Sequence, residues 1–418
     1  MRNIERTLLR IFLIAALAAL TAGLATAMTI EVGTCHIENG DDEHISAQFS
    51  TIQAAVNAAA PGSEVLVCPG TYPEQVEITK PLTLKGVRSG NMGAAVIVPP
   101  PGGLIVPLSN ATASAPQVFA HDINGEVKIS NLTVDASNNL ITNCASPIFI
   151  IGVYLLNVAG SIENVVTRNQ NTVATSACAN GVGLRVYAST IPSQITVRKN
   201  TASMYDSMGL LAQGTGATVT IDDNSFVELP GSAGIVVFDD VSTTVSENTV
   251  SGNANAFSGI AVVGVHNAII TDNHVGGDPY GITLYTFTGD PNSDGNTISN
   301  NEIFGSGADG IAVCGDNNLI QGNTVSRSTQ SAVNLVTGAT FGAQCTSNNN
   351  RVTDNRINGA CTGVLVDPAA SGNTIGRDNK MFNAVSLQLT GTTCTSLATT
   401  KLKTVQKTAP RSARLRVR

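Results

Sequence analysis

The chain has 418 residues, a formal net charge of −7 and 13% charged side chains. An acidic balance of this kind excludes a basic nucleic-acid-binding surface. The absence of tryptophan and an aromatic content of 4% argue against a sugar site lined by many stacked rings.

The first 27 residues have the three parts of a secretion signal. Three arginines form the basic region, residues 11–24 the apolar core, and Ala25-Thr26-Ala27 the small-residue cleavage site. An apolar run of about 14 residues is too short to span a bilayer comfortably, and no later stretch is long enough. We therefore expect a mature chain that begins near Met28, without a transmembrane segment, and that is secreted, periplasmic or on the cell surface.

Residues 28–100 are expected to form a cap and the first coils of the repeats that follow. Ser50-Thr51-Ile52-Gln53 has the form of a capping box, which opens a helix that stops at Pro61-Gly62. Strands are predicted after it over residues 64–68, 74–78 and 82–84. Since the open end of stacked strands exposes apolar core and unpaired backbone, the helix is predicted to cover that end.

Residues 101–400 contain an internal repeat marked by ten asparagines, whose successive spacings are 33, 36, 24, 24, 25, 28, 22, 32 and 24 residues. They are Asn131, Asn164, Asn200, Asn224, Asn248, Asn273, Asn301, Asn323, Asn355 and Asn379. Short runs of Val, Ile and Thr on both sides predict strand, tight turn, strand. A following phrase such as Gly259-Ile260-Ala261-Val262 predicts a third strand. The period and the short runs predict a parallel β-solenoid and exclude helical repeats.

The repeated asparagine has a structural and a ligand-binding interpretation. Asn tolerates the left-handed backbone conformation, so each one is predicted to bend the chain between two strands. Stacked amides would also hydrogen-bond along the column. We favour this structural role over a ladder of ligand-binding sites.

Eight cysteines agree with an oxidising compartment and allow 105 disulfide connectivities. Relative to the repeated asparagines, Cys314 and Cys345 fall at nearly the same register, as do Cys144 and Cys178, so consecutive pairing is predicted. The predicted disulfides are Cys35–Cys68, Cys144–Cys178, Cys314–Cys345 and Cys361–Cys394. A metal cluster is the alternative, but the chain has no Cys-x-x-Cys motif.

Residues 401–418 carry seven basic side chains and no acidic one. Without this tail and the signal, the body keeps 13 basic and 29 acidic residues, a net charge near −16. A disordered, solvated tail is predicted, with a clamp for a polyanion or for the cell envelope as the alternative.

The opening segment and the later asparagine and glycine phrases together carry a family resemblance. The opening contains Ser50-Thr51-Ile52-Gln53-Ala54-Ala55-Val56, Pro61-Gly62, Pro69-Gly70-Thr71-Tyr72 and Lys80-Pro81-Leu82-Thr83-Leu84. Over residues 48–390 the chain resembles the right-handed parallel β-helix proteins of the pectin-lyase-like superfamily. The resemblance implies an all-β, right-handed parallel β-helix of about ten or more coils. Pectin methylesterases, polygalacturonases, pectate lyases and alginate epimerases are enzymes of this superfamily, which also contains non-enzymes.

The active-site patterns of these enzymes are incomplete in this chain. Ala308-Asp309-Gly310 is similar to a polygalacturonase segment with two adjacent aspartates, of which Asp309 matches the second. The resemblance makes Asp309 a candidate catalytic residue, but Ala308 replaces the first aspartate and the histidine expected one coil later is absent. The methylesterase patterns are also absent. Since inverting hydrolysis needs two carboxylates on opposite sides of one bond, a single match does not supply that chemistry.

Stacked coils convert a repeated register into a column of side chains, and one such column is acidic. The residues before three successive asparagines are Asp223, Glu247 and Asp272. Carboxylates about 5 Å apart repel one another and could recruit a hard cation such as Ca²⁺, which makes them candidate metal ligands. The alternative is an outward-facing turn where water screens the charges.

A second column follows the Gly-Ile-x-Val strands and could combine acid, base and sugar contact. Its candidate catalytic residues are Asp239, Asp240, His266 and Asp316. The candidate substrate-binding residues are Phe238, Tyr280, Tyr285, Arg351 and Arg356. Rings would stack on a sugar and arginines would neutralise a uronate. Unrelated loop residues and a surface ion pair are the alternatives.

We therefore predict a secreted, monomeric protein that binds or processes an extracellular, acidic polysaccharide or another component of the cell envelope. If it is an enzyme, the predicted class is polysaccharide lyase, glycoside hydrolase or epimerase, with Ca²⁺ as the candidate cofactor. A non-catalytic surface, adhesion or structural solenoid is the alternative, favoured by the low aromatic content and the incomplete motifs.

Overall fold

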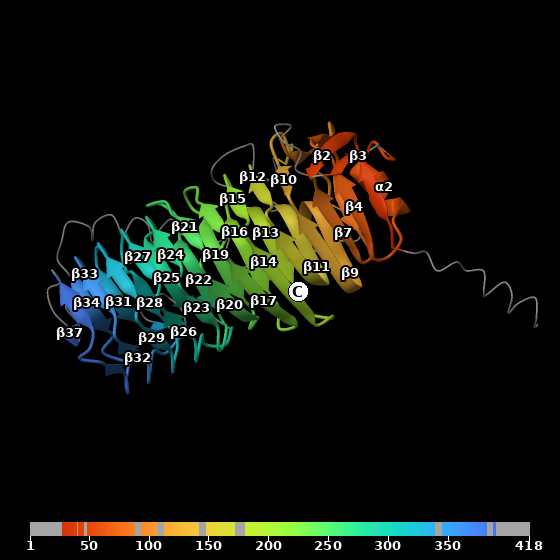
Figure 1. Cartoon of the computed structure of the whole chain (residues 1–418). Helices are drawn as coiled ribbons and strands as arrows, with labels where there is room; N and C mark the ends of the chain where they lie inside the picture. Colours follow the sequence, from red (N-terminus) through yellow and green to blue (C-terminus); the bar gives the residue numbers. More distant parts are fainter. Residues whose placement is uncertain are drawn as a thin grey trace, which may run out of the picture.

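Every strand of the described chain stacks in parallel with others, except for one antiparallel hairpin. The computed structural model describes residues 27–39, 41–45, 48–87, 93–106, 113–141, 148–171, 180–287, 289–338, 345–382 and 388–389. The predicted secretion signal and basic tail fall outside these ranges. The hairpin, β2 (Cys35–Asn39) and β3 (Asp41–Ile45), lies at the N-terminal end of the stack (Figure 1).

The parallel strands form three columns, and the chain visits the columns in turn. The first column contains β6 (Val76–Ile78), β9 (Ser114–Ser130), β11 (Phe149–Glu163), β13 (Gly181–Tyr187), β16 (Met208–Gln213), β19 (Ala233–Phe238), β22 (Ser258–Val263), β25 (Tyr280–Tyr285), β28 (Ile311–Val313), β31 (Ser331–Leu335), β34 (Thr362–Val366) and β37 (Gln388–Leu389). The second contains β1 (Thr29–Val32), β4 (Ser63–Val67), β7 (Leu82–Gly86), β14 (Ser193–Arg198), β17 (Ala217–Asp222), β20 (Ser242–Ser246), β23 (Ile269–Thr271), β26 (Thr297–Ser299), β29 (Leu319–Gln321), β32 (Arg351–Thr353) and β35 (Thr374–Ile375).

The third column forms a separate 12-stranded sheet. It contains β5 (Gly70–Pro73), β8 (Ala95–Val98), β10 (Leu132–Asp135), β12 (Val166–Arg168), β15 (Thr201–Ser203), β18 (Ser225–Val227), β21 (Thr249–Ser251), β24 (His274–Gly276), β27 (Glu302–Phe304), β30 (Thr324–Ser326), β33 (Arg356–Asn358) and β36 (Lys380–Phe382). The long strands β9 and β11 run through the first two columns, so these two join into one 23-stranded sheet. The predicted parallel solenoid is confirmed.

The interior is a set of apolar stacks that run along the solenoid. Ile260 of β22 pairs in register with Ile235 on the preceding coil and with Ile282 on the next, and all three are fully buried. Because side chains alternate across a strand, the residues between these core positions belong to the outer face. Coils about 4.8 Å apart therefore give every core residue two apolar neighbours from other coils.

The asparagine column is a hydrogen-bonded ladder, as predicted. From Asn200 to Asn379, the backbone N–H and the side-chain Nδ2 of each asparagine donate to Oδ1 of the next at 2.9–3.0 Å. Nδ2 also donates to a backbone carbonyl, as Asn248 does to Ile221 at 2.9 Å. The ladder therefore supplies hydrogen-bond partners to the buried backbone and amide groups of the turn.

The predicted position of the left-handed backbone was wrong for most of this column. Asn131 and Asn164 adopt it, with φ of 58° and 52°. From Asn200 to Asn355, however, the preceding residue adopts it, as Asp223 does with φ of 52° and Glu247 with φ of 56°. The asparagine must direct its amide into the stack, so the exposed residue before it makes the bend.

A second asparagine ladder, which the sequence analysis missed, lies at the corner between the first and second columns. It contains Asn296, Asn318, Asn350 and Asn373, each placed directly before a strand of the second column. Each backbone N–H donates to Oδ1 of the next asparagine at 2.7–2.8 Å. The C-terminal half of the solenoid is thus held at two of its corners.

The helix α2 (Ile52–Ala58) begins one residue later than predicted. Its N-cap is Thr51, whose hydroxyl accepts from the N–H of Ala54 at 3.3 Å, so Ser50 is not the cap. The backbone N–H groups of Ile52 and Gln53 donate to the carboxylate of Glu74 at 2.8 Å. A distant carboxylate therefore replaces the predicted capping box.

Gln53 of this helix contacts the edge strand β6 instead of returning to the helix start. Its side chain accepts from the N–H of Glu77 at 2.6 Å and donates to the carbonyl of Glu77 at 3.0 Å. The helix packs against β1, β4 and β6 at the N-terminal end (Figure 1). The amide of Gln53 thus bonds the backbone of β6 as a neighbouring strand would, while the covering of the whole end by the helix stays a prediction.

Two of the four predicted disulfides are present, Cys35–Cys68 and Cys314–Cys345. Cys361 is also disulfide-bonded, and its predicted partner Cys394 lies outside the described residues. The predicted pair Cys144–Cys178 lies outside them as well. Among the described residues, no helix is long and apolar enough to cross a membrane.

Replacing Asn248 by alanine should lower the free energy of unfolding by about 1–3 kcal/mol, because it leaves buried partners on both neighbouring coils unsatisfied. Urea unfolding followed by circular dichroism measures the effect. Asn255→Ala, at an exposed loop position, is the control and should be neutral. Equal stability of the two variants would contradict the structural role of the ladder.

The double variant Cys314→Ser/Cys345→Ser should lose about 2–4 kcal/mol of stability, because the reduced chain regains unfolded-state entropy. The same unfolding assay measures it, and a reductant should then have a smaller effect on the variant than on the parent. An unchanged unfolding midpoint would show that this disulfide does not constrain the coils.

Candidate functional site

The outer face of the first column carries a continuous row of aromatic and polar side chains. The register pairs Phe119 with Tyr154, Tyr154 with Arg185, and Arg185 with Leu211 on successive coils. The rings of Phe119 and Tyr154 stack at 5.2 Å between centroids. These outward-pointing residues form an apolar cluster separate from the solenoid interior, continued by Phe238.

Arg185 lies in the middle of this row without an acidic partner among the described residues. Its guanidinium carbon stands 4.8 Å from the centroid of the Tyr154 ring, and Nη2 donates to Oε1 of Gln213 at 3.2 Å. Nε has no hydrogen-bond partner, although the side chain is only 1% exposed. Gln213 in turn donates to Oδ2 of Asp239 at 2.8 Å, so the guanidinium is linked to that carboxylate through one amide.

A histidine–carboxylate contact stands at the N-terminal end of the row. Nε2 of His121 lies 3.1 Å from Oε1 of Glu77, and Nδ1 lies 3.3 Å from Oδ2 of Asp122. The imidazole also stacks on Phe119, with 4.5 Å between the ring centroids. This group was not predicted from the sequence.

Asp240 and His266 are brought together, as the predicted second column required. Nδ1 and the backbone N–H of His266 both approach Oδ1 of Asp240, at 2.9 and 3.1 Å. An N–H at Nδ1 leaves the lone pair on Nε2, the arrangement of a base oriented by a carboxylate. The side chains are 37% and 45% exposed, so solvent and ligands reach both.

The predicted aromatic residues lie beside this pair on the first column. Phe238 pairs in register with Val263, and Val263 with Tyr285. Phe287 joins the two rings, with centroids 6.1 Å from Phe238 and 4.9 Å from Tyr285 in edge-to-face geometry. Burial raises the pKa of the Tyr285 hydroxyl.

A further carboxylate, Asp290, faces Asp239 at this end of the row. Burial, and after it the charge of Asp239, raise the pKa of Asp290. No group of three or more His, Cys, Asp and Glu side chains within the described ranges is arranged to hold a metal ion. The described carboxylates at this end are therefore not arranged as a metal site.

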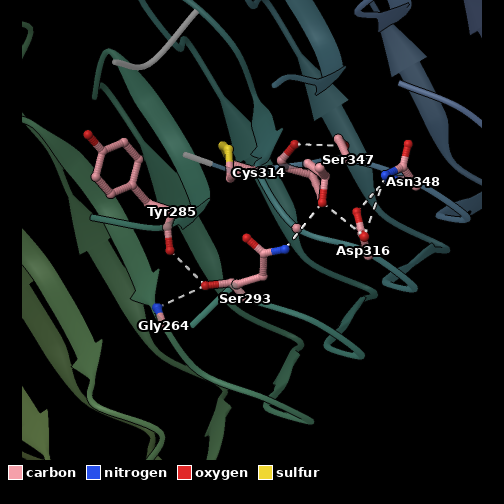
Figure 2. Close-up of a disulfide and its surroundings, with 12 residues drawn as sticks. Gly264, Tyr285, Ser293, Cys314, Asp316, Ser347 and Asn348 are labelled. Atoms are coloured by element: carbon pink, nitrogen blue, oxygen red, sulfur yellow. Dashed lines mark hydrogen bonds between the residues drawn. A yellow bond between two sulfur atoms is a disulfide. The ribbon is translucent and has the colours of Figure 1, made fainter. Parts of the chain in front are cut away.

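Asp316 lies on the same corner of the solenoid as His266, two coils further on, with Asp294 on the coil between them. Its carboxylate accepts from the hydroxyl of Thr346 at 2.9 Å and from the backbone N–H of Asn348 at 2.6 Å, next to the Cys314 disulfide (Figure 2). The ring of Tyr285 points to the opposite side from Asp316 in the same view. Asp316 therefore braces this corner between coils, and its own backbone N–H donates to Oδ1 of Asp294 on the preceding coil at 2.6 Å.

Asp309, the match to the polygalacturonase pattern, is an interior residue and not an accessible acid. It is 3% exposed and accepts from the N–H of Ser331 at 3.0 Å and from Nδ2 of Asn334 at 2.9 Å. Burial raises the pKa of Asp309, and these hydrogen bonds oppose the shift. Burial, and after it the Asp309 charge, raise the pKa of neighbouring Tyr280. The predicted catalytic role of Asp309 does not fit this burial.

Arg351 and Arg356 lie away from the first column, so the structure does not bring them to the other candidates. Arg351 belongs to the second column, and its charge contributes to the lowered pKa of Asp378, for which the Thr353 hydroxyl is the largest cause. Arg356 belongs to the third column and stands over the ring of Phe382 at 4.9 Å.

Asp223, Glu247 and Asp272 do not form a metal-binding cluster. All three are exposed turn residues with left-handed backbone, φ of 52° to 57°. The turn directs them to water, which screens their charges. These three residues therefore form an outward-facing acidic column, which was the alternative interpretation.

The residues that the sequence analysis missed are Arg185, Tyr154, Gln213, His121 and Glu77. A signal for one of them was available: Arg185 is the only charged residue of the strand Gly181–Tyr187, which is otherwise apolar apart from its terminal tyrosine. The pairing of His121 with Glu77 joins residues 44 positions apart, and no repeat spacing marks it.

Comparisons with known proteins agree with this geometry at the level of the fold. Residues 208–379 match the family model described as right-handed β-helix region. No curated protein sequence matches the chain.

Solved structures give the same result for a larger part of the chain. The A-module of mannuronan C-5 epimerase AlgE6 from Azotobacter vinelandii is 19% identical, with a TM-score of 0.53, over 81% of this chain and 95% of that one. The GH136 lacto-N-biosidase from Eubacterium ramulus is 12% identical, with a TM-score of 0.55, over 92% and 71%. A PL6 alginate lyase in complex with a trisaccharide is 12% identical, with a TM-score of 0.51, over 86% and 84%.

At these identities the likeness shows the fold alone, and it agrees with the winding expected from the family resemblance. By its fold, the chain is a right-handed parallel β-helix protein.

Proposed function

We propose that the outer face of the first column, from His121 to Tyr285, binds an acidic polysaccharide outside the cytoplasm. The observation that carries this proposal is Arg185, a guanidinium without an acidic partner among the described residues, set in a row of aromatic rings. Arginine binds planar carboxylates through paired N–H groups, and a uronate presents one carboxylate per sugar. Because Arg185 is 1% exposed, binding would displace the groups that cover it.

The spacing of the row supports a chain-like ligand. Successive coils are about 4.8 Å apart, close to the length of one sugar in an extended polysaccharide. Rings at Phe119, Tyr154, Phe238 and Tyr285 lie on different coils of this face, the first three at most 8% exposed, so that a sugar would reach them only by displacing the groups that cover them. Aromatic side chains stack on sugar rings, and the polar groups between them fix the orientation.

The Asp240–His266 pair supplies the chemistry if the protein is an enzyme. Nε2 of His266 would take a proton from a bound sugar or give one to it, and Asp240 would hold the imidazole and stabilise its positive charge. A lyase, an epimerase or a hydrolase each needs such a step. The likeness to the mannuronan epimerase and the alginate lyase supports a polysaccharide as the substrate class.

Secretion is part of this proposal. The disulfides Cys35–Cys68 and Cys314–Cys345 support an oxidising compartment, where extracellular glycans are encountered. The predicted secretion signal supports the same location.

A non-catalytic solenoid that only binds a glycan or an envelope component is the second candidate. It is favoured by the roles of Asp309 and Asp316, which hold the structure together, so that neither adds an acid to the Asp240–His266 pair. The variants below separate the two candidates.

His266→Gln and Asp240→Asn should each lower turnover of a polyuronate by about 100-fold or more, because proton transfer loses its base or the group that orients it. Alginate, polygalacturonate and a neutral glycan are incubated with the protein, and reducing ends, unsaturated uronate absorbance and the ratio of uronate epimers are followed. His274→Gln is the matched control, since His274 contacts Glu302 at 3.2 Å on the third column. No turnover by the parent protein in any channel would remove the enzyme interpretation.

Arg185→Met should weaken binding of an oligouronate roughly 10- to 100-fold, because a charge-assisted contact is lost while the apolar stem is kept. Isothermal titration calorimetry measures the affinity. Arg198→Met is the control, since Arg198 pairs with Glu163 at 3.0 Å on the second column. Equal affinities of the two variants would place the acidic ligand elsewhere.

A further inference from the structure

A column of buried polar side chains runs inside the solenoid, at the turn between the third and first columns. Its members follow successive strands of the third column and are at most 5% exposed: Gln170, Tyr205, Glu228, Asp278, Ser306 and Ser328. Each of these side chains has at least one oxygen without a hydrogen-bond partner. Buried polar atoms in folded proteins nearly always have a hydrogen-bond partner, so each such oxygen needs an explanation.

Glu228 and Asp278 are the two ionisable members, and the coil between them makes room for their contact. The N–H of Glu228 bonds the carbonyl of Ser251, and the N–H of Gly252 bonds the carbonyl of Gly276, so the three turns stack in sequence. Gly252 contributes no side chain at the middle level. A Cβ there would collide with both carboxylate oxygens of Asp278, which shows that Asp278 fills the space under Glu228.

The pair has no cationic neighbour among the described residues. Glu228 is 5% exposed and Asp278 is fully buried, and all four carboxyl oxygens lack a donor in hydrogen-bond geometry. The other ionisable group that faces them is Tyr205, whose hydroxyl is fully buried and also unpartnered. The backbone N–H of Gly234 lowers the pKa of Glu228 and that of Asn253 lowers the pKa of Asp278, each against the larger effect of burial.

Two adjacent carboxylates cannot both stay ionised in such a place. Desolvation disfavours each charge, and the two charges repel one another across the contact. Burial first, and then the Asp278 carboxyl, raise the pKa of Glu228, and burial raises that of Asp278. A proton between two oxygens removes the repulsion and supplies the missing donor, as in other carboxyl pairs.

We propose that Glu228 and Asp278 share a proton inside the folded solenoid at neutral pH, so that folding of the central coils takes up a proton. The proposal is independent of the proposed function, although the two residues precede strands that carry the proposed binding face. Glu228 leads into β19, which ends in Phe238, and Asp278 leads into β25, which ends in Tyr285. The carboxyl pair therefore lies in the interior of the same coils that carry the candidate site on their outer face.

The pH dependence follows from the raised folded-state pKa values. The stabilisation is fully present below the unfolded values, at about pH 4, and is lost as the pH rises towards the folded values. Over this window the folded state holds one proton that the unfolded state has released. The folding equilibrium constant then falls about tenfold per pH unit for that proton.

The test compares urea unfolding of the full chain with that of Glu228→Gln and Asp278→Asn, between about pH 5 and about pH 8. A glutamine or asparagine supplies an N–H donor to the remaining carboxylate without a titrating proton. The ratio of the variant's folding constant to that of the parent should rise about tenfold per pH unit. Glu247→Gln, at an exposed turn on the coil between, is the control and should give a ratio independent of pH.

Infrared spectroscopy of the folded proteins in D₂O gives a readout that does not depend on unfolding. The parent should show the carbonyl stretch of a protonated carboxyl at neutral pH, and the two variants should lack it. Pair variants whose ratios do not change with pH, or a parent without this band, would overturn the proposal. Stabilisation of the parent by Ca²⁺, lost in EDTA and in Glu228→Gln, would overturn it in favour of a buried cation.

Discussion

The hydrogen bonding between successive coils is the constraint on which the rest of this structure depends. Each parallel strand fixes the register of the next, and the asparagine ladder fixes the turn between the second and third columns. Once register is fixed, residues 22 to 36 positions apart become neighbours about 4.8 Å apart. Function in this fold is therefore a property of columns, and a residue's neighbours along the sequence say little about its chemistry.

The two faces of a column impose opposite demands on polar side chains. An outward position accepts His266 or Asp240, because a charge there is solvated. Arg185 also lies on the outer face, but it is 1% exposed and rests on the ring of Tyr154. An inward position accepts an amide that stacks, as in the ladder, or a hydroxyl. It accepts the Glu228–Asp278 pair only if that pair is neutralised, because both side chains are buried. The central coils thus carry the proposed binding face on one side and a titrating interior on the other.

Much of the fold was predictable because its signals are periodic. The asparagine spacing predicted the coils, the ladder and the register of Cys314 with Cys345. The contact of Asp240 with His266 was predicted from the same register argument. The register also placed Asp316 on the His266 corner, but two coils away, where its carboxylate holds Thr346 and Asn348. Asp309 does not fit its predicted role, because a motif match does not report burial. The Glu228–Asp278 pair was not predicted, because the two residues follow third-column strands two coils apart and no motif marks them.

A crystal structure of the protein with a bound oligouronate tests the central claim most directly. The account predicts a sugar chain along the outer face of the first column, with one carboxylate at the guanidinium of Arg185 and a ring within reach of His266. A ligand on the second or third column, or no ordered ligand at saturating concentration, would contradict it.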